Sequence, residues 1–283
     1  MLILHNTYYM YFMIALFSLA VGSLLNVIIY RLPIMLQTEW RQQCCDLLQV
    51  ESKKGSNLNL FFPRSFCPHC QTLVKAWQNI PIISYLFLKG KCYQCHGPIS
   101  IRYPLIELLT LVLSFYATWH FGLTLQLPFV LVAIWLLICL FFIDLDHQIL
   151  PDSLTLSLLW LGLLANTQNL FTSLPDAVFS AAGAYLVLWL FIKIFYLLTG
   201  KIGMGNGDFK LFAAFGAWFG WTMLPLILLL SSITGVIVGI IYLKLQNKTT
   251  DTAIPFGPFL CAAGLVALFW GHRILNWYLH IWI

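Results

Sequence analysis

Residues 127–143 read LPFVLVAIWLLICLFFI, a run of 17 residues without one charged side chain. A run this apolar is typical of a helix that crosses a membrane, which needs about 20 apolar residues. The whole chain of 283 residues shares this character, since 60% of them are hydrophobic and only 9% are charged. Soluble domains carry about 25% charged residues, and disordered chains are far less apolar. The sequence therefore predicts an all-α polytopic membrane protein.

About eight transmembrane helices are expected on the same criterion. They are placed at residues 8–30, 105–121, 127–143, 153–171 and 177–198, twice within 209–243, and from residue 256 onward. The stretch 209–243 is too long for one crossing, and we expect it to divide near Gly220–Trp221. This gives three segments: a first transmembrane helix at 1–30, a loop at 31–104 and a helical bundle at 105–283.

The basic residues are unevenly distributed, and this predicts the orientation. Nine of the 15 Lys and Arg residues lie between Arg31 and Arg102. Positive residues stay on the cytoplasmic side of membranes, so the loop at 31–104 is expected in the cytoplasm and the N-terminus outside. In that arrangement 14 of the 15 lie in or beside cytoplasmic segments, with Arg273 the exception. We therefore attribute the net charge of +5 to membrane topology, and we expect no nucleic-acid partner. We also expect no cleavable signal peptide, because no basic region precedes the first apolar stretch.

Four cysteines in the loop have the spacing of a metal site. Cys67 and Cys70 form one Cys-x2-Cys pair, Cys92 and Cys95 form a second, and 21 residues separate the pairs. This separation is just beyond the usual zinc-ribbon range, yet two such pairs are a strong signal. Four thiolates complete a tetrahedral shell around zinc and leave no position for water, so we predict one structural zinc ion per chain. The reducing cytosol disfavours disulfides.

The remaining cysteines and the neighbouring histidines have weaker patterns. His69 and His96 flank the pairs and could ligate a metal, although the four thiolates already suffice. Cys139 and Cys261 lie in predicted spans, where cysteine is commonly a small packing residue. Chance cysteines are the alternative to the metal site.

Two carboxylates stand at the predicted cytoplasmic ends of spans. Asp144 directly follows the run at 127–143, and Asp208 ends the glycine-rich stretch Gly203-Met-Gly-Asn-Gly-Asp208. Ionisable groups at a membrane boundary are functional candidates. Two neighbouring carboxylates share a proton, so that one activates water and the other polarises a peptide carbonyl. We therefore predict a catalytic pair that acts as in aspartic proteases. Helix dipoles favour the proton on Asp144 and the role of base for Asp208.

The other acidic residues have structural interpretations. Asp152 is expected at the start of a helix as a cap or first-turn acid. Asp146 and His147 are expected in a solvated loop, and Glu107 is expected to pair with a cation of the loop. We interpret the remaining acids as ordinary exposed residues: Glu39, Asp46, Glu51, Asp176 and Asp251.

The chain resembles the bacterial type IV prepilin peptidase family over nearly its whole length. The matching motifs are both cysteine pairs and residues 22–33, 79–85, 97–107, 144–152 and 205–208. The resemblance implies a bifunctional enzyme of the bacterial inner membrane, with catalytic aspartates at Asp144 and Asp208 and zinc at the four cysteines. It also implies that type IV prepilins and type II secretion pseudopilins are cleaved after a Gly that ends a basic leader. The new N-terminus is then methylated with S-adenosylmethionine as the donor.

Two alternatives remain open beside this interpretation. A peptidase-only relative would lack the methyltransferase, for which the sequence has no Gly-x-Gly-x-x-Gly turn or other cofactor fingerprint. A non-enzymatic transporter or assembly factor would use its acids as a proton relay, but those are expected near mid-membrane at broken helices. In this chain Asp144 and Asp208 are both predicted at the cytoplasmic edge of the membrane. Membrane lipid is the other expected partner, and the binding site of the methyl donor is not predicted.

Overall fold

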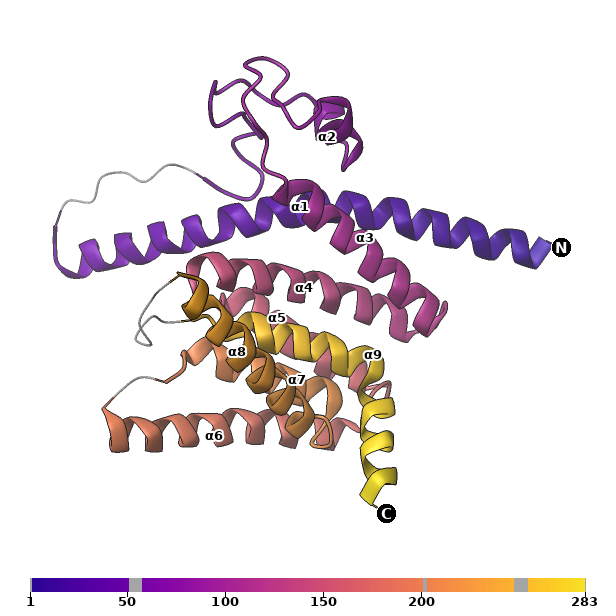
Figure 1. The fold of residues 1–283 in the computed structure, drawn as a ribbon, viewed down its shortest axis with the longest axis vertical. Coiled ribbons are helices and arrows are strands. Elements are labelled where there is room, and N and C mark those ends of the chain that lie inside the picture. The colour runs from indigo at the N-terminus through magenta and orange to yellow at the C-terminus, as the bar shows by residue number, and fades with distance from the viewer. Residues whose placement is uncertain (1, 51–57, 201–202, 247–253, 283) are drawn as a thin grey trace. The chain divides into compact units, whose positions relative to one another are not determined.

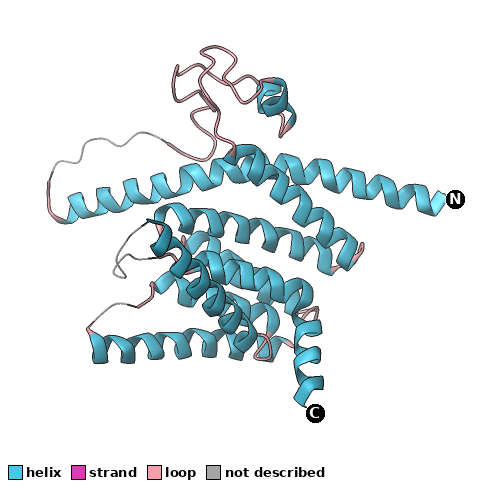
Figure 2. Cartoon of the chain, viewed as in Figure 1, coloured by secondary structure: helices cyan, strands magenta, loops and turns pink. Residues whose placement is uncertain are grey.

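The computed structural model describes residues 2–50, 58–200, 203–246 and 254–282. These residues form helices joined by loops, as Figures 1 and 2 show. The elements are α1 (Leu2–Leu47), the 3-10 helix η1 (Ala76–Asn79), α2 (Ile83–Phe87), α3 (Arg102–Phe121), α4 (Gln126–His147), α5 (Asp152–Asn166), α6 (Leu174–Thr199), α7 (Asn206–Phe219), α8 (Leu224–Gln246) and α9 (Gly257–Trp282). Six charged residues lie outside the described ranges: Glu51, Lys53, Lys54, Lys201, Lys248 and Asp251.

The all-α membrane class is confirmed, and each of the eight predicted spans corresponds to a helix. Within the described ranges, six helices are long and apolar enough to cross a membrane: α1, α3, α4, α6, α8 and α9. The other two, α5 and α7, have 15 and 14 residues. At 1.5 Å per residue they extend about 21–23 Å, less than the hydrocarbon core of about 30 Å. The division near Gly220 is confirmed, since α7 ends there with a φ of 71°.

The first helix extends well beyond the residue where we expected it to end. The apolar run stops at Tyr30, but α1 continues to Leu47 and contains Pro33. The residues that follow include Met, Leu, Gln, Glu and Arg, which have high helix propensity. A change from apolar to polar composition therefore marks an expected membrane boundary here and not the end of the helix.

The chain divides into two compact units, residues 1–122 and 123–283. In the first unit, α1 crosses α3 closely. A Cβ atom on Gly22 would lie 2.9 Å from the Cα of Glu107, so only glycine permits this approach. Beside it, the Asn26 side chain donates a hydrogen bond to the carbonyl of Tyr103. Small residues and polar side chains at a crossing are typical of helix pairs in membranes.

In the second unit, the short helices α5 and α7 run parallel to each other. At their N-terminal ends Lys210 pairs with Asp152. At their C-terminal ends the Asn166 amide donates to the carbonyls of Ala217 and Trp218. The long helix α6 connects them and runs antiparallel to α7, where a Cβ on Gly216 would lie 2.7 Å from a carbonyl oxygen of α6. This arrangement brings the N-termini of α5 and α7 to the same end of the unit.

Candidate functional site

Asp144 is buried near the C-terminal end of α4, with only 5% of its surface exposed. The backbone of Gly257, the first residue of α9, lies against its carboxylate. A Cβ on Gly257 would lie 2.6 Å from Asp144 Oδ2, so a larger residue would displace the carboxylate. The start of α9 therefore fixes the position of Asp144.

Asp208 is the third residue of α7 and is also buried, with 7% of its surface exposed. Its Oδ2 accepts a hydrogen bond of 3.2 Å from the N–H of Gly205, the residue that precedes the helix. An acid at this position that turns back to the N-cap is a common way to stabilise a helix start. The other oxygen, Oδ1, is buried and has no hydrogen-bond partner among the described residues. That oxygen is free to accept a proton from a ligand.

The structure brings the two predicted carboxylates to one location. Asp144 and Asp208 lie near enough for their negative charges to repel each other. Leu150 connects the surrounding elements, because added Cβ atoms on Gly207 and Gly257 would both press against its side chain, at 2.7 and 3.2 Å. The site thus lies where the end of α4 meets the starts of α7 and α9. Helix N-termini favour negative charge, which helps to hold two acids in a buried place.

The nearest lysine in the sequence does not neutralise this pair. Lys210 follows Asp208 by two residues, but its Nζ donates to both carboxylate oxygens of Asp152, at 2.6 and 2.7 Å. Asp152 is the acid of the first turn of α5, as expected, and it forms no side-chain cap. The sequence analysis missed the pairing with Lys210, since nothing in the sequence indicates that α5 and α7 lie side by side.

Two further predictions about acids have different outcomes. Asp146 and His147 are exposed, as expected, although both still belong to α4. Glu107 was expected to pair with a cation of the loop, and this prediction is wrong. Its Oε2 accepts a 2.7 Å hydrogen bond from the backbone N–H of Ile82, which positions the loop between η1 and α2.

The four predicted cysteines form one cluster in the first unit. Their sulfur atoms all lie within 4.8 Å of one another. Cys67 and Cys95 are 3.8 Å apart, and Cys70 and Cys92 are 4.0 Å apart. Zinc–sulfur bonds of about 2.3 Å in a tetrahedron require sulfur atoms about 3.8 Å apart, so the cluster fits zinc. His69 and His96 do not belong to the cluster.

Each cysteine pair is held by the same local turn. In the first, the N–H of Cys67 donates to Thr72 and the N–H of Gln71 donates back to Cys67. In the second, Cys92 and His96 form the equivalent bonds. Gln71 and His96 occupy corresponding places with φ of 59° and 54°. The turns therefore present two sulfurs each without a regular helix or sheet.

Hydrogen bonds make two of the thiols more acidic than usual. The Thr72 side chain, 3.2 Å from the sulfur, and the Thr72 backbone lower the pKa of Cys70 to about 6. Backbone hydrogen bonds from Cys95 and Gln94 lower the pKa of Cys92. Thiolates are the form that binds metal, so these turns favour a metal ligand even before the ion binds.

Gly257 lies in direct contact with Asp144, and the sequence analysis did not single it out. It stands between Pro255 and Pro258 at the expected start of the last span. A glycine between two prolines at a helix start could have indicated a close backbone approach. Cys261 was expected to be a packing residue, and it is buried one turn further along α9, near both carboxylates.

Known proteins resemble this chain along its whole length. Residues 16–121 match the bacterial peptidase A24 N-terminal domain, and residues 131–240 match the type IV leader peptidase family. A prepilin leader peptidase/N-methyltransferase of Legionella pneumophila is 67% identical over 283 residues, which is 100% of this chain and 99% of the relative. Proteins of the same name from Stutzerimonas stutzeri and Pseudomonas aeruginosa are each 51% identical over 93% of this chain and 91% of their own length. No solved structure matches the chain.

Proposed function

The chain belongs to the type IV leader peptidase family and is an enzyme, a leader peptidase and N-methyltransferase that acts on prepilins, and we propose that Asp144 and Asp208 perform the cleavage. Its substrates on this proposal are type IV prepilins and type II secretion pseudopilins. The observation that carries the assignment is the pair of buried carboxylates at one end of the second unit, each beside a glycine that packs against Leu150.

The proposed cleavage uses one shared proton and one water molecule. Two neighbouring buried carboxylates do not both ionise readily, so one proton is held between them. Asp208 acts as the base, because its Oδ1 has no hydrogen-bond partner in the described part of the chain and can accept a proton from water. Asp144 carries the shared proton and donates it toward the carbonyl oxygen of the peptide bond. The hydroxide adds to the carbonyl carbon. Asp208 then passes the proton that it took from water to the amine nitrogen, Asp144 takes its proton back from the hydroxyl oxygen, and the bond after the Gly of the leader breaks.

Each acid in this scheme is held by the backbone of a glycine. Gly257 packs against Oδ2 of Asp144, and the N–H of Gly205 donates to Oδ2 of Asp208. These contacts fix one oxygen of each carboxylate and leave the other for the chemistry. Groups fixed before the substrate arrives need no reorganisation during the reaction, which lowers the barrier.

We propose a structural role for zinc at the cysteine cluster. The four sulfurs would hold one ion, which would connect the turns at Cys67–Cys70 and Cys92–Cys95. A shell closed by four thiolates leaves no position for substrate, so the ion would stabilise the loop and take no part in the cleavage. The loop needs such support, because between α1 and α3 the described residues form only two helices, η1 and α2, of four and five residues.

S-adenosylmethionine is the proposed methyl donor, in keeping with the N-methyltransferase activity named for the relatives. The amine that cleavage exposes would take the methyl group as the carbon–sulfur bond of the donor breaks. The thioether would leave as S-adenosylhomocysteine, and the amine would lose a proton to solvent. We assign no residue of the chain to this step.

The proposed location is the bacterial inner membrane, with the aspartates and the cysteine cluster on the cytoplasmic face. The support is the charge distribution, since nine of 15 basic residues lie between Arg31 and Arg102. A leader that positive charges retain in the cytoplasm would also be cleaved at that face. The chain thus meets its substrate on the side where the leader remains.

One experiment tests the proposed function as a whole. The purified full-length protein is incubated with a prepilin and isotopically labelled S-adenosylmethionine, and the N-terminus of the product is analysed by mass spectrometry. We expect a product that begins after the leader Gly and carries the labelled methyl group. Cleavage without label would indicate a peptidase-only relative, and an unprocessed precursor would indicate a transporter or assembly factor.

A further inference from the structure

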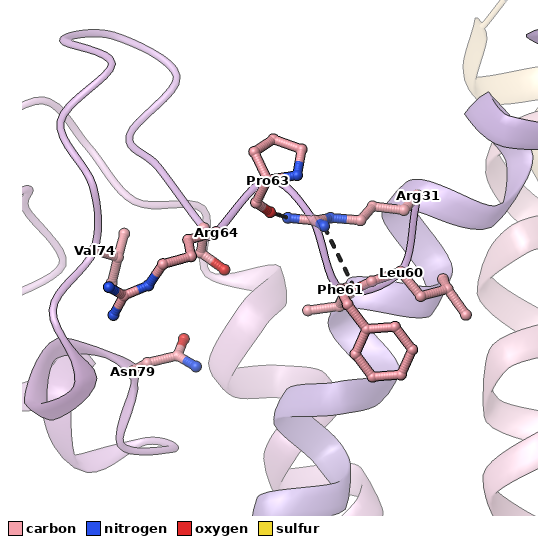
Figure 3. Close-up of a pocket in the computed structure, with 9 residues that line it drawn as sticks. Arg31, Leu60, Phe61, Pro63, Arg64, Val74 and Asn79 are labelled. Atoms are coloured by element: carbon pink, nitrogen blue, oxygen red, sulfur yellow. Dashed lines mark hydrogen bonds between the residues drawn. The ribbon is translucent and has the colours of Figure 1, made fainter. Parts of the chain in front are cut away.

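A pocket of about 230 Å³ lies beside α1 in the first unit. Figure 3 shows the residues that line it. They come from α1, from the loop at 60–65, from η1 and from Val74 just before it. Neither the peptidase nor the metal site uses these residues. The polar side chains among them are Arg31, Arg64, Ser65 and Asn79, and no acidic residue lines the pocket.

Arg31 is the fixed part of this pocket. The residue is 7% exposed, which is unusual for a charged side chain. Its guanidinium donates to the carbonyls of Asn59 and Leu60 at 2.9 and 3.4 Å and to that of Pro63 at 2.6 Å. These bonds use at most three of the five N–H groups of an arginine. Carbonyl oxygens hold the side chain in place, but they do not neutralise its charge.

A second guanidinium stands at the other side of the pocket. Arg64 is exposed, and it forms no hydrogen bond or ion pair with any residue that the structure describes. Figure 3 shows its guanidinium next to the amide of Asn79, while that of Arg31 lies next to Pro63. Two positive charges without a carboxylate predict an anionic ligand. The planar donors of arginine suit the oxygens of a carboxylate or a phosphate.

The position of the pocket identifies the source of that anion. Arg31 directly follows the apolar run that ends at Tyr30, so it stands where the first span is expected to leave the membrane. Aromatic side chains around it face outward, since Tyr30, Phe61 and Phe62 are 60, 81 and 67% exposed. Exposed aromatic residues are typical of the membrane interface, at the depth of the lipid headgroups. A polar head with an apolar tail matches both the basic interior and the aromatic rim.

We propose that this pocket binds the phosphate of an anionic membrane phospholipid. Arg31 and Arg64 donate to the phosphate oxygens, Ser65 and Asn79 can supply further hydrogen bonds, and the acyl chains lie along Phe61 and Tyr30. The volume is below the 300–1,000 Å³ usual for a complete small-molecule ligand, which suits one headgroup. The bound lipid would connect α1 to the loop at 59–65 and hold that loop at the membrane surface.

The test measures lipid binding to the full-length protein in detergent. Phosphatidylglycerol is titrated, and the bound lipid is counted by native mass spectrometry for wild type and for Arg64→Gln. Arg64 has no partner among the described residues, so the variant should fold normally. Arg41→Gln is the matched control, because Arg41 is an exposed arginine of α1 outside the pocket. We expect one tightly bound phosphatidylglycerol, bound about tenfold more weakly by Arg64→Gln and unchanged in Arg41→Gln, since one charge-assisted hydrogen bond is lost.

Three results would overturn the proposal. The first is equal affinity of wild type and Arg64→Gln for phosphatidylglycerol. The second is equal affinity of the wild type for phosphatidylcholine, because a neutral lipid does not need two arginines. The third concerns inorganic phosphate, whose affinity is measured on protein without added lipid. An affinity higher than that for phosphatidylglycerol would identify a soluble anion as the ligand. Loss of affinity in Arg64→Gln alone, with selectivity for the anionic lipid, supports it.

Discussion

The cysteine cluster and the aspartate pair hold their functional groups in opposite ways. In the cluster, two turns of a few residues each present the sulfurs, and four atoms reach the spacing that zinc requires within residues 67–95. In the pair, Asp144 and Asp208 are 64 positions apart and meet because α4, α7 and α9 pack together. The first site is built by local turns and suits a metal ion. The second needs the helices of the whole second unit.

This difference has a consequence for stability. If the cluster holds the proposed zinc ion, the loop around it, which has little regular structure, would gain free energy of folding from that ion. The aspartates are supported by a packed core around α4 and α7, since their sequence neighbours Ile143 and Phe209 are buried. We therefore expect changes at one site to leave the other largely intact, and four predictions test this.

The largest expected effect follows from replacing either aspartate. Asp144→Asn and Asp208→Asn should each slow leader cleavage about a thousandfold, because an amide cannot exchange the proton that general acid–base catalysis requires. Zinc content should stay at that of wild type. Cleavage is measured by mass spectrometry and zinc by elemental analysis. Asp146→Asn is the matched control, since Asp146 is an exposed acid of the same helix. A precursor processed at a near-normal rate by Asp144→Asn would refute the pair.

The next effect concerns the metal. Cys67→Ser or Cys92→Ser should weaken zinc binding about a hundredfold or more, because one of four thiolates is lost from a closed site. Limited proteolysis should then cut the loop at 58–101 faster, while the helices of the second unit stay protected. The control is Cys44→Ser, an exposed cysteine outside the cluster. Wild-type protein that is free of metal and equally resistant to protease would contradict this prediction.

A smaller effect is expected where only the support of an aspartate changes. Gly257→Ala adds a methyl group that would lie 2.6 Å from Asp144 Oδ2, so the carboxylate must move. We expect cleavage to fall about tenfold, because small displacements of catalytic groups reduce rates strongly. Gly235→Ala in α8 is the control, since its nearest neighbour would lie at an ordinary 3.4 Å. Normal kinetics of Gly257→Ala would mean that this contact does not position Asp144.

The smallest effect is expected at the ion pair between α5 and α7. Lys210→Met should reduce cleavage no more than about threefold, because ion pairs with exposed members contribute roughly 0–1 kcal/mol. The side chains of Lys210 and Asp152 are 29 and 59% exposed. A matched change from the other side, Asp152→Asn, should have the same small effect. A loss comparable to that of Asp208→Asn would show that Lys210 acts in the chemistry itself.

Much of the architecture could be predicted from hydropathy alone. All eight expected helices are present, and the division at Gly220 follows from a stretch too long for one crossing. Two features could not be predicted in this way. The extension of α1 to Leu47 depends on the helix propensity of polar residues, and the shortness of α5 and α7 depends on where the chain turns. Hydropathy reports the composition of a segment and does not mark where its helix begins or ends.

The sequence by itself determined the membrane class and the four cysteines of the cluster. Both depend on short-range patterns. The membrane class follows from apolar runs long enough to cross a bilayer, and the cluster follows from pairs of thiols at the spacing of one turn. It also singled out Asp144 and Asp208 as acids in unusual places. Only the tertiary structure decided that they meet, that Gly257 holds one of them, and that Lys210 pairs with Asp152 instead. Those relations join residues far apart in the chain, and they arise from packing, which no local pattern encodes.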